Sequence, residues 1–284
     1  QRVGLGITYD KTDIDVGTSP AREIWDFTNA EGNIFETLTA QTSWQRVTLN
    51  RGTFPTDGAS TALSFSSTLP GSDIDYFRLN IRQKYYQPLS QNFVFGFSGE
   101  IGYLSAFGDT KETPFFQNFY AGGPRSLRGF ESNTLGPRST EAPCYQFNYS
   151  EGTCPNLIDT DGDGELDYPY YNPYANSNTQ RNPIGGNIKI EGSFQLIFRL
   201  PFIEDQRSMR SAFFFDFGNV FSDNCKEYQF NCYKPALEDL RYSYGVGVTW
   251  ITGFGPMSFA ISKPTNAGQF EETEEFQFTV GNVF

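Results

Sequence analysis

The best candidate for a metal site is an acidic, glycine-rich segment in the middle of the chain. Its aspartates follow the spacing of a calcium loop, at positions 1, 3, 5 and 9 with a glycine at position 6, and carboxylate oxygens are ligands that Ca²⁺ prefers. Position 12 is Tyr170 instead of the bidentate glutamate of an EF-hand. Two interpretations stay open, a structural calcium site and an acidic surface loop. The candidate ligands are Asp159, Asp161, Asp163 and Asp167.

Four cysteines form two close pairs in the sequence, Cys144 with Cys154 and Cys225 with Cys232. An even number of closely spaced cysteines is typical of an oxidising compartment outside the cytosol. We therefore expect two disulfides, each closing a small loop.

Enzyme chemistry finds no support in the sequence. The chain has no histidine, so it lacks the commonest general base and the commonest ligand of transition metals. A G-x-S-x-G turn, a phosphate-binding loop and a C-x-x-C motif are also absent. We predict that the protein is not an enzyme and has no cofactor apart from the possible calcium. A net charge of −12 further argues against a nucleic-acid partner.

The elements that carry these residues are predicted to be β-strands. Aromatic residues make up 17% of the chain, yet the mean hydropathy is −0.46, which indicates that apolar and polar residues alternate. A membrane-spanning helix needs about 20 consecutive apolar residues, and the sequence contains no such run. A closed β-barrel is the other structure that satisfies its backbone polar groups inside a bilayer.

A period of two predicts ten antiparallel strands. One face of the strands carries Arg, Lys and Glu, as expected for a wet lumen, and the other carries Phe and Tyr, as expected for contact with lipid. A soluble β-sandwich also alternates and remains the competing interpretation. Three weaker strands lie near residues 1–9, 34–49 and 59–69, and the clearer ones lie at 77–82, 93–103, 188–199, 213–218, 242–250, 257–262 and 276–284.

The connections alternate between short turns and longer loops. In bacterial barrels the short turns are periplasmic and the long loops extracellular. The longest loop, at about 105–186, is predicted to be functional because ordinary hairpin loops are far shorter. A segment at 20–27 could form a short helix that covers the barrel mouth. The short turns are expected at 50–58, 87–91, 201–208 and 252–256, and the other loops at 10–33, 70–74, 222–238 and 264–274.

Three motifs in the same order resemble the BamA-type family of outer-membrane protein insertases. The sequence F-Y-A-G-G at 119–123 leads to L-R-G-F at 127–130, which matches the family's inward loop tip. The sequence R-G-T-F-P-T-D-G at 51–58 resembles the family's R-G-Y-F-P-T-D-G turn, and F-F-F-D-F-G at 213–218 resembles its aromatic-D-x-G strand. The resemblance covers nearly the whole chain.

The resemblance implies an all-β, antiparallel transmembrane β-barrel, with about ten strands here of a probable sixteen. Residues 1–284 would form a single barrel domain. In the family's barrel they would begin at about the seventh strand, so that periplasmic POTRA domains and six strands would precede them. The implied function is non-enzymatic insertion of β-barrel proteins into the bacterial outer membrane. The implied partners are outer-membrane lipids, unfolded β-barrel clients and assembly lipoproteins. A passive channel or a two-partner secretion pore of the same superfamily is the alternative.

The loop tip consists of Leu127, Arg128, Gly129 and Phe130. Strand parity places Asp216 in the lumen, where an unpaired carboxylate would be costly, and an arginine on the loop could pair with it bidentately. The alternative is that lumen water hydrates Asp216 and that Arg128 lies on the surface. The family also has a glutamate that contacts this arginine from the neighbouring strand. The aligned position here is Gln195, with Glu191 nearby on the same face.

The last strand, expected at 274–284, is predicted to be the functional edge of the sheet. In the family this strand meets the first strand only loosely, so a client strand could add to it by edge pairing. Gly281 is expected to weaken the edge, because it packs no side chain and favours a bend. Phe276, Phe278 and Phe284 mark this edge. We expect that the fragment alone is not a competent insertase, and it could close as a smaller barrel.

Overall fold

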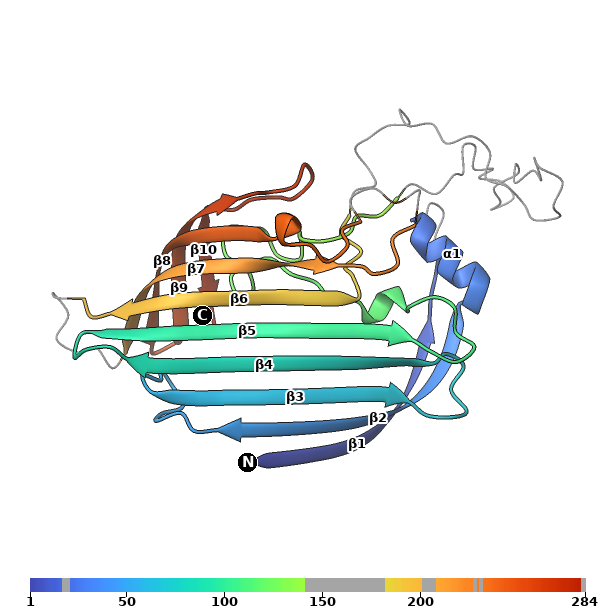
Figure 1. Cartoon of the computed structure of the whole chain (residues 1–284), viewed down its shortest axis with the longest axis horizontal. Helices are drawn as coiled ribbons and strands as arrows, with labels where there is room; N and C mark the ends of the chain where they lie inside the picture. The colour runs from blue at the N-terminus through green and yellow to red at the C-terminus, as the bar shows by residue number, and fades with distance from the viewer. Residues whose placement is uncertain (17–20, 141–181, 201–207, 227–228, 230–231, 282–284) are drawn as a thin grey trace.

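The computed structural model contains one antiparallel sheet of ten strands in the sequential order β1 to β10 (Figure 1). It describes residues 1–16, 21–140, 182–200, 208–226, 229 and 232–281. The predicted fold class and strand number are confirmed. The strands are β1 (Arg2–Asp13), β2 (Ile34–Val47), β3 (Gly58–Thr68), β4 (Tyr76–Pro88), β5 (Phe93–Ala106), β6 (Ile188–Phe198), β7 (Met209–Phe221), β8 (Arg241–Thr252), β9 (Gly255–Thr265) and β10 (Phe276–Val280).

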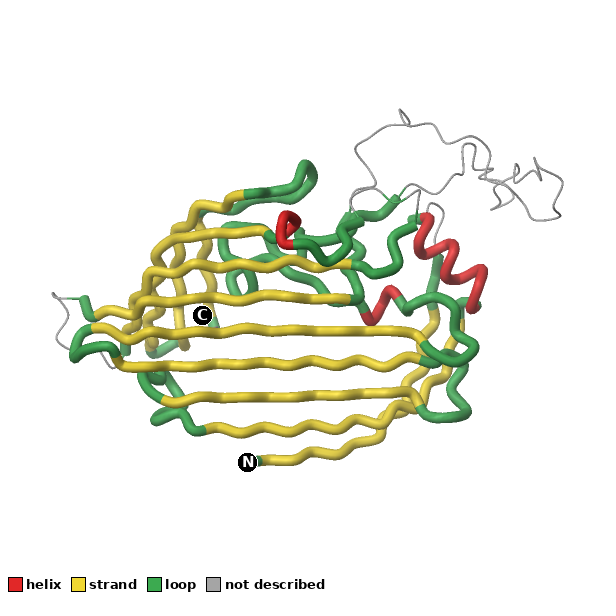
Figure 2. The backbone as a smooth tube through the Cα atoms, in the orientation of Figure 1, coloured by secondary structure: helices red, strands yellow, loops and turns green. Residues whose placement is uncertain are grey.

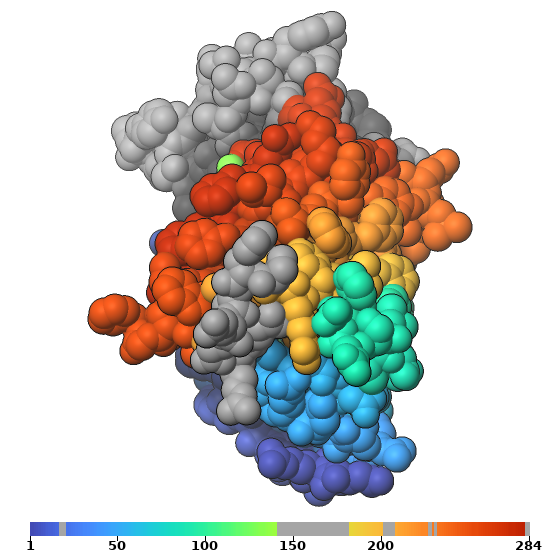
Figure 3. All heavy atoms as spheres, turned by 90° about the vertical axis from the view of Figure 1, so that its left-hand side faces the viewer, coloured from blue at the N-terminus to red at the C-terminus, as the bar shows by residue number. Residues whose placement is uncertain are grey.

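The sheet is strongly curled, so that β9 and β10 lie behind β5 and β6 in the view of Figures 1 and 2. Within the described residues β1 pairs only with β2 and β10 only with β9, and the two edge strands do not close on each other. Figure 3 looks at the end of the molecule with the short turns, where the colours follow the strand order from blue through teal and yellow to orange. None of the described helices is both long and apolar enough to cross a membrane.

The two faces of the sheet differ as the alternation predicts. On β7, Phe213 is 54% exposed and Phe215 is 41% exposed on the convex face, whereas Asp216 is fully buried on the concave face. Side chains that alternate along a strand must point to opposite faces. Aromatic rings pack across neighbouring strands on the convex face, for example Phe194 against Phe217 at 5.6 Å between centroids. The phenylalanines are not buried between two sheets, so the sandwich interpretation is wrong.

A hydrophobic core lies on the concave side, towards the end with the long loops. Helix α1 (Arg22–Glu31) covers this end, as the sequence predicted, and buries Phe27 against Phe35 of β2. Two short 3₁₀ turns, η1 (Phe115–Gln117) and η2 (Leu237–Asp239), lie in the long loops. The core consists of Phe27, Phe35, Ile74, Tyr76, Leu104, Phe119, Ala121, Leu127, Phe130, Leu135 and Val220.

The last strand is shorter than predicted. It runs from Phe276 to Val280, so that Gly281, with φ of +83°, follows the strand instead of interrupting it. At the other end the backbone N–H of Glu274 donates to the carbonyl of Gly129, a residue of the long loop. The strand therefore begins after a segment whose backbone is bound to the loop. Phe284 lies outside the described residues.

Candidate functional site

In the connection between β5 and β6, the described segment 119–138 folds onto the concave side of the sheet. The described parts of this connection are 107–140 and 182–187, which agrees with the predicted loop at 105–186. All four residues of the predicted tip are buried, and Leu127 and Phe130 have no exposed surface. The tip is thus packed inside the curl of the sheet.

Arg128 and Asp216 form the ion pair that the sequence predicted. Arg128 Nη2 lies 2.7 Å from Asp216 Oδ1, and Nε lies 2.7 Å from Oδ2. The backbone N–H of Arg128 also donates to Oδ2, at 3.2 Å. Two parallel charge-assisted bonds give both strength and a fixed orientation to the guanidinium group. The side chains are 5% and 0% exposed, so the two charges compensate each other away from water.

Two further contacts of Arg128 were missed from the sequence. Its Nη2 donates to Ser193 Oγ at 3.0 Å, and Ser193 on β6 lies directly opposite Asp216 in the strand register. The guanidinium group also lies over the ring of Phe214, 3.5 Å from the centroid, in a cation–π arrangement. Parity puts Phe214 on the concave face together with Asp216, so the signal for this contact was present in the sequence.

Glu191 and Gln195, the expected additional partners on the neighbouring strand, both lie close to the tip. Glu191 accepts a hydrogen bond from Ser126 of the loop and pairs with Lys189 at 3.1 Å. Gln195 donates to Ser193 Oγ at 3.4 Å, and Ser193 in turn binds Arg128. Glu191 therefore holds the loop through Ser126, while Gln195 is connected to the arginine through Ser193.

Two of the predicted edge residues, Phe276 and Phe278, lie on the convex side of β10. Phe276 is 57% exposed and Phe278 is 46% exposed. Between them Gln277 points to the concave side, where it is 1% exposed and binds the loop tip. The site thus combines a buried loop tip, a lumen carboxylate and the last strand.

A family model, the Omp85 superfamily domain, matches residues 1–284. The chain belongs to the Omp85 superfamily. It is 30% identical over 292 residues to the outer membrane protein assembly factor BamA of Neisseria meningitidis, which covers 97% of this chain and 30% of the relative. It is 27% identical over 182 residues to the sorting and assembly machinery component 50 homolog of Mus musculus, which covers 63% of this chain and 30% of the relative.

Among solved structures, the fold is similar to that of BamA from Haemophilus ducreyi lacking POTRA domains 1–3. The TM-score is 0.73 at 28% identity, over 99% of this chain and 51% of that chain. This Omp85 chain spans about 30% of the length of the curated relatives it matches. The comparisons confirm the resemblance to BamA and the outer-membrane β-barrel fold. They also agree with the prediction that the protein is not an enzyme.

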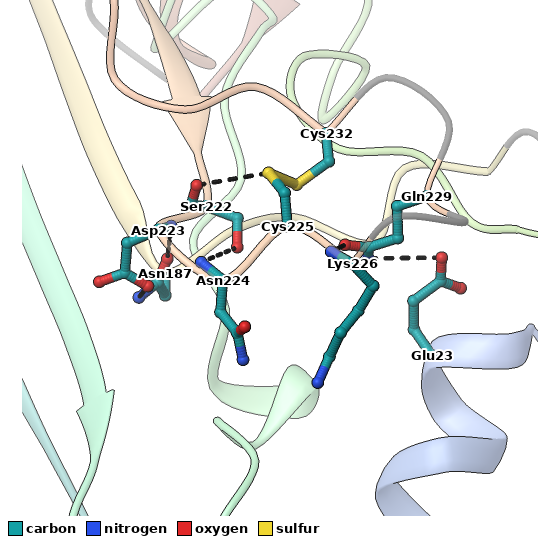
Figure 4. Close-up of a disulfide and its surroundings, with 9 residues drawn as sticks. All are labelled: Glu23, Asn187, Ser222, Asp223, Asn224, Cys225, Lys226, Gln229 and Cys232. Atoms are coloured by element: carbon teal, nitrogen blue, oxygen red, sulfur yellow. Dashed lines mark hydrogen bonds between the residues drawn. A yellow bond between two sulfur atoms is a disulfide. The ribbon is translucent and has the colours of Figure 1, made fainter.

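A disulfide joins Cys225 and Cys232 in the connection between β7 and β8, as predicted (Figure 4). In the same segment Gln229 donates to Glu23 of α1 at 3.4 Å. Glu23 also accepts the backbone N–H of Thr140, and burial raises the pKa of this carboxyl group. The loop closed by the disulfide is therefore connected to the helix that covers the long-loop end.

The other predicted disulfide and the predicted calcium segment are not among the described residues. Cys144, Cys154 and residues 159–167 lie outside the described residues. The part of the chain that the structure describes contains no group of three potential metal ligands. Calcium binding by the aspartates and the Cys144–Cys154 bridge stay predictions.

A pair of glycines turns the Omp85 loop so that its tip reaches the lumen wall. Gly122 and Gly123 have φ of +103° and +98°, a conformation that residues with a Cβ atom rarely adopt. A Cβ atom on Gly122 would lie 2.4 Å from the backbone oxygen of Glu131. The N–H of Gly122 donates to Ser126 Oγ, which binds Glu191. The turn and the anchoring of the loop are thus parts of one hydrogen-bonded unit.

We expect Gly122→Ala in the full-length protein to lower the free energy of unfolding by about 1–3 kcal/mol, because the residue would be strained at positive φ. Urea unfolding of the barrel in lipid vesicles measures this change. Gly52→Ala is the matched control, since Gly52 lies in a turn where an added Cβ meets nothing within 4 Å. Equal stability of the two variants would contradict the role given to the turn.

Proposed function

We propose that this chain forms part of the barrel of a non-enzymatic insertase, which folds and inserts β-barrel proteins into the bacterial outer membrane. The observation that carries the proposal is the short pairing of the last strand, β10. Only five residues of β10 pair with β9, whereas twelve residues of β1 pair with β2. A short edge strand with a free side offers backbone donors and acceptors to an incoming strand.

The hydrogen-bonding direction of β10 defines which groups are free. Ser262 N–H donates to the carbonyl of Glu275, and Gly281 N–H donates to the carbonyl of Pro256. Since bonding directions alternate along an antiparallel strand, the odd-numbered residues bond towards β9. The N–H and C=O groups of Phe276, Phe278 and Val280 then point to the open edge. A client strand would bind there.

The relatives support this assignment through their names, which describe an outer membrane protein assembly factor and a sorting and assembly machinery component. The proposed partners are outer-membrane lipids on the convex aromatic face, unfolded β-barrel clients at β10, and lipoproteins of an assembly machinery. We further propose that residues 1–284 act as one barrel domain. Its inward loop would brace the wall next to the edge strand.

Reconstitution of the full-length protein in lipid vesicles tests the proposal, with the rate at which an unfolded client barrel becomes folded as the readout. Phe278→Pro removes the N–H that points to the open edge, but leaves the bonds towards β9 in place. We expect this variant to lose most client folding. Phe278→Ala is the control, because it removes the ring but keeps the N–H.

Equal activity of the proline and alanine variants would contradict insertion by edge pairing. Vesicles that conduct ions but fold no client would contradict the insertase function altogether. That second result would favour the passive channel or secretion pore.

A further inference from the structure

The loop tip binds the last strand as well as the lumen wall. Residues 270–277, which span the end of the β9–β10 connection and the start of β10, form a ladder of hydrogen bonds with loop residues 129–138. Within this ladder Phe130 and Thr273 form a β-bridge. The bonds join Gly129 to Glu274 and Gln277, Phe130 to Gln277, Glu131 to Glu272, Thr134 to Glu272, and Arg138 to Phe270.

Gln277 is the member of this ladder that belongs to β10. Its side chain is almost fully buried, and its Oε1 accepts the N–H of Gly129 at 3.3 Å. Its Nε2 donates to the carbonyl of Phe130 at 2.8 Å and to Glu274 Oε2 at 3.3 Å. A neutral amide has both an acceptor and two donor hydrogens. A leucine would supply neither and a carboxylate could only accept, so glutamine fits this position chemically.

The opposite side of the tip is fixed to a different part of the sheet. Arg128, the residue before Gly129, is bound to Asp216 on β7 and to Ser193 on β6. In the sheet order β8 and β9 separate β7 from β10. Three consecutive loop residues, 128–130, therefore connect two strands that do not touch each other through the sheet ladder.

We propose that Gln277 is a positioning residue that couples the loop tip to the last strand, so that the alignment of the open edge depends on the loop. The consequence for client binding rests on the proposed insertase function. β10 has few bonds to β9, and the bonds to the loop hold it from the concave side. A client strand would then meet an edge that is already aligned.

Hydrogen–deuterium exchange of the full-length protein in lipid vesicles tests the coupling. Gln277→Leu leaves the N–H of Gly129 and the carbonyl of Phe130 buried without this partner. We expect the protection of the Gly129 and Glu274 amides to fall about tenfold or more. Thr279→Val is the matched control, because Thr279 lies on the same face of β10 and its hydroxyl has no hydrogen-bond partner in the described structure.

Gln277→Glu adds a test that a loss of packing does not mimic. A protonated carboxyl group can donate to Phe130 and accept from Gly129, whereas the ionised form has no proton to donate. We expect protection to be low at about pH 8 and to recover towards about pH 5. Glu274 faces the introduced group, and Glu131 and Glu272 lie in the same ladder, where their mutual hydrogen bond raises the pKa of Glu131. The unsubstituted protein, measured at both pH values, shows how much of the change in amide protection comes from these other carboxyl groups.

Client folding is measured on the same samples. Lower protection with slower client folding in Gln277→Leu, and recovery of both in Gln277→Glu at low pH, would support the proposal. Unchanged protection in Gln277→Leu would overturn it, as would client folding at the normal rate despite lost protection. If Gln277→Leu does not fold, absence of a pH effect in Gln277→Glu overturns it instead. Failure of the unsubstituted protein to fold any client would refute the insertase function. The amide protection of Gly129 and Glu274 would still test the coupling between the loop and β10.

Discussion

Replacing Arg128 with alanine is expected to lower the free energy of unfolding of the full-length barrel by about 3–5 kcal/mol, the cost of breaking a buried ion pair by removing one partner. Asp216 is fully buried and receives two bonds from the guanidinium group, so its charge would stay in the lumen wall without compensation. The loop tip would also lose its bond to Ser193. Urea unfolding in lipid vesicles and the fraction of folded barrel report the loss.

The control for this variant is Arg125→Ala, since Arg125 lies three residues away in the same loop but is exposed. We expect it to change stability by less than about 0.5 kcal/mol. The double variant Arg128→Ala with Asp216→Ala should be less destabilised than the sum of the single variants, because it leaves no buried charge. An Arg128→Ala barrel that assembles normally and keeps its loop in place would rule out the structural role.

The strands could be predicted because they depend on a local pattern, and the ion pair because that pattern was combined with a motif. A period of two fixes which face a residue lies on, and parity alone places Asp216 inside. Arg128 needed the motif as well, since the two residues are separated by 88 positions in the chain. Burial of a carboxylate then demands a cation. The family's loop motif, more than this cost of burial, singled out Arg128 as the partner of Asp216.

The role of Gln277 could not be predicted in the same way. Its alternation assigns it to the concave face, but many polar residues share that face. Its partners are the backbone groups of Gly129 and Phe130, and backbone groups carry no residue-specific signal. The start of β10 was misplaced for the same reason, because the carbonyl of Gly129 binds the N–H of Glu274. A side chain that binds backbone across the lumen is visible only in three dimensions.

The second large effect is expected for Phe130→Ala, which should lower the free energy of unfolding by about 3–5 kcal/mol. Phe130 has no exposed surface and belongs to the core that joins α1, the sheet and the loop. Loss of the ring leaves a cavity next to the bridge between Phe130 and Thr273. The change should therefore loosen the last strand as well as the core.

Two further substitutions separate the ring from the loop as a whole. Phe130→Leu keeps part of the buried volume, so it should cost clearly less than the alanine variant. Tyr120→Ala removes an aromatic ring that is 37% exposed in the same loop, and we expect a smaller loss there because less apolar surface returns to water. Urea unfolding should show the largest loss in free energy of unfolding for Phe130→Ala, a smaller loss for Phe130→Leu and the smallest for Tyr120→Ala. If Tyr120→Ala lowers the free energy of unfolding as much as Phe130→Ala, any substitution in the loop is destabilising, and the packing of the tip is not the cause.

Because the backbone carbonyl of Phe130 also accepts the hydrogen bond of Gln277, exchange of the Glu274 amide should be fastest in Phe130→Ala, slower in Phe130→Leu and slowest in Tyr120→Ala. That ranking of exchange rates would link the packing of the tip to the position of β10.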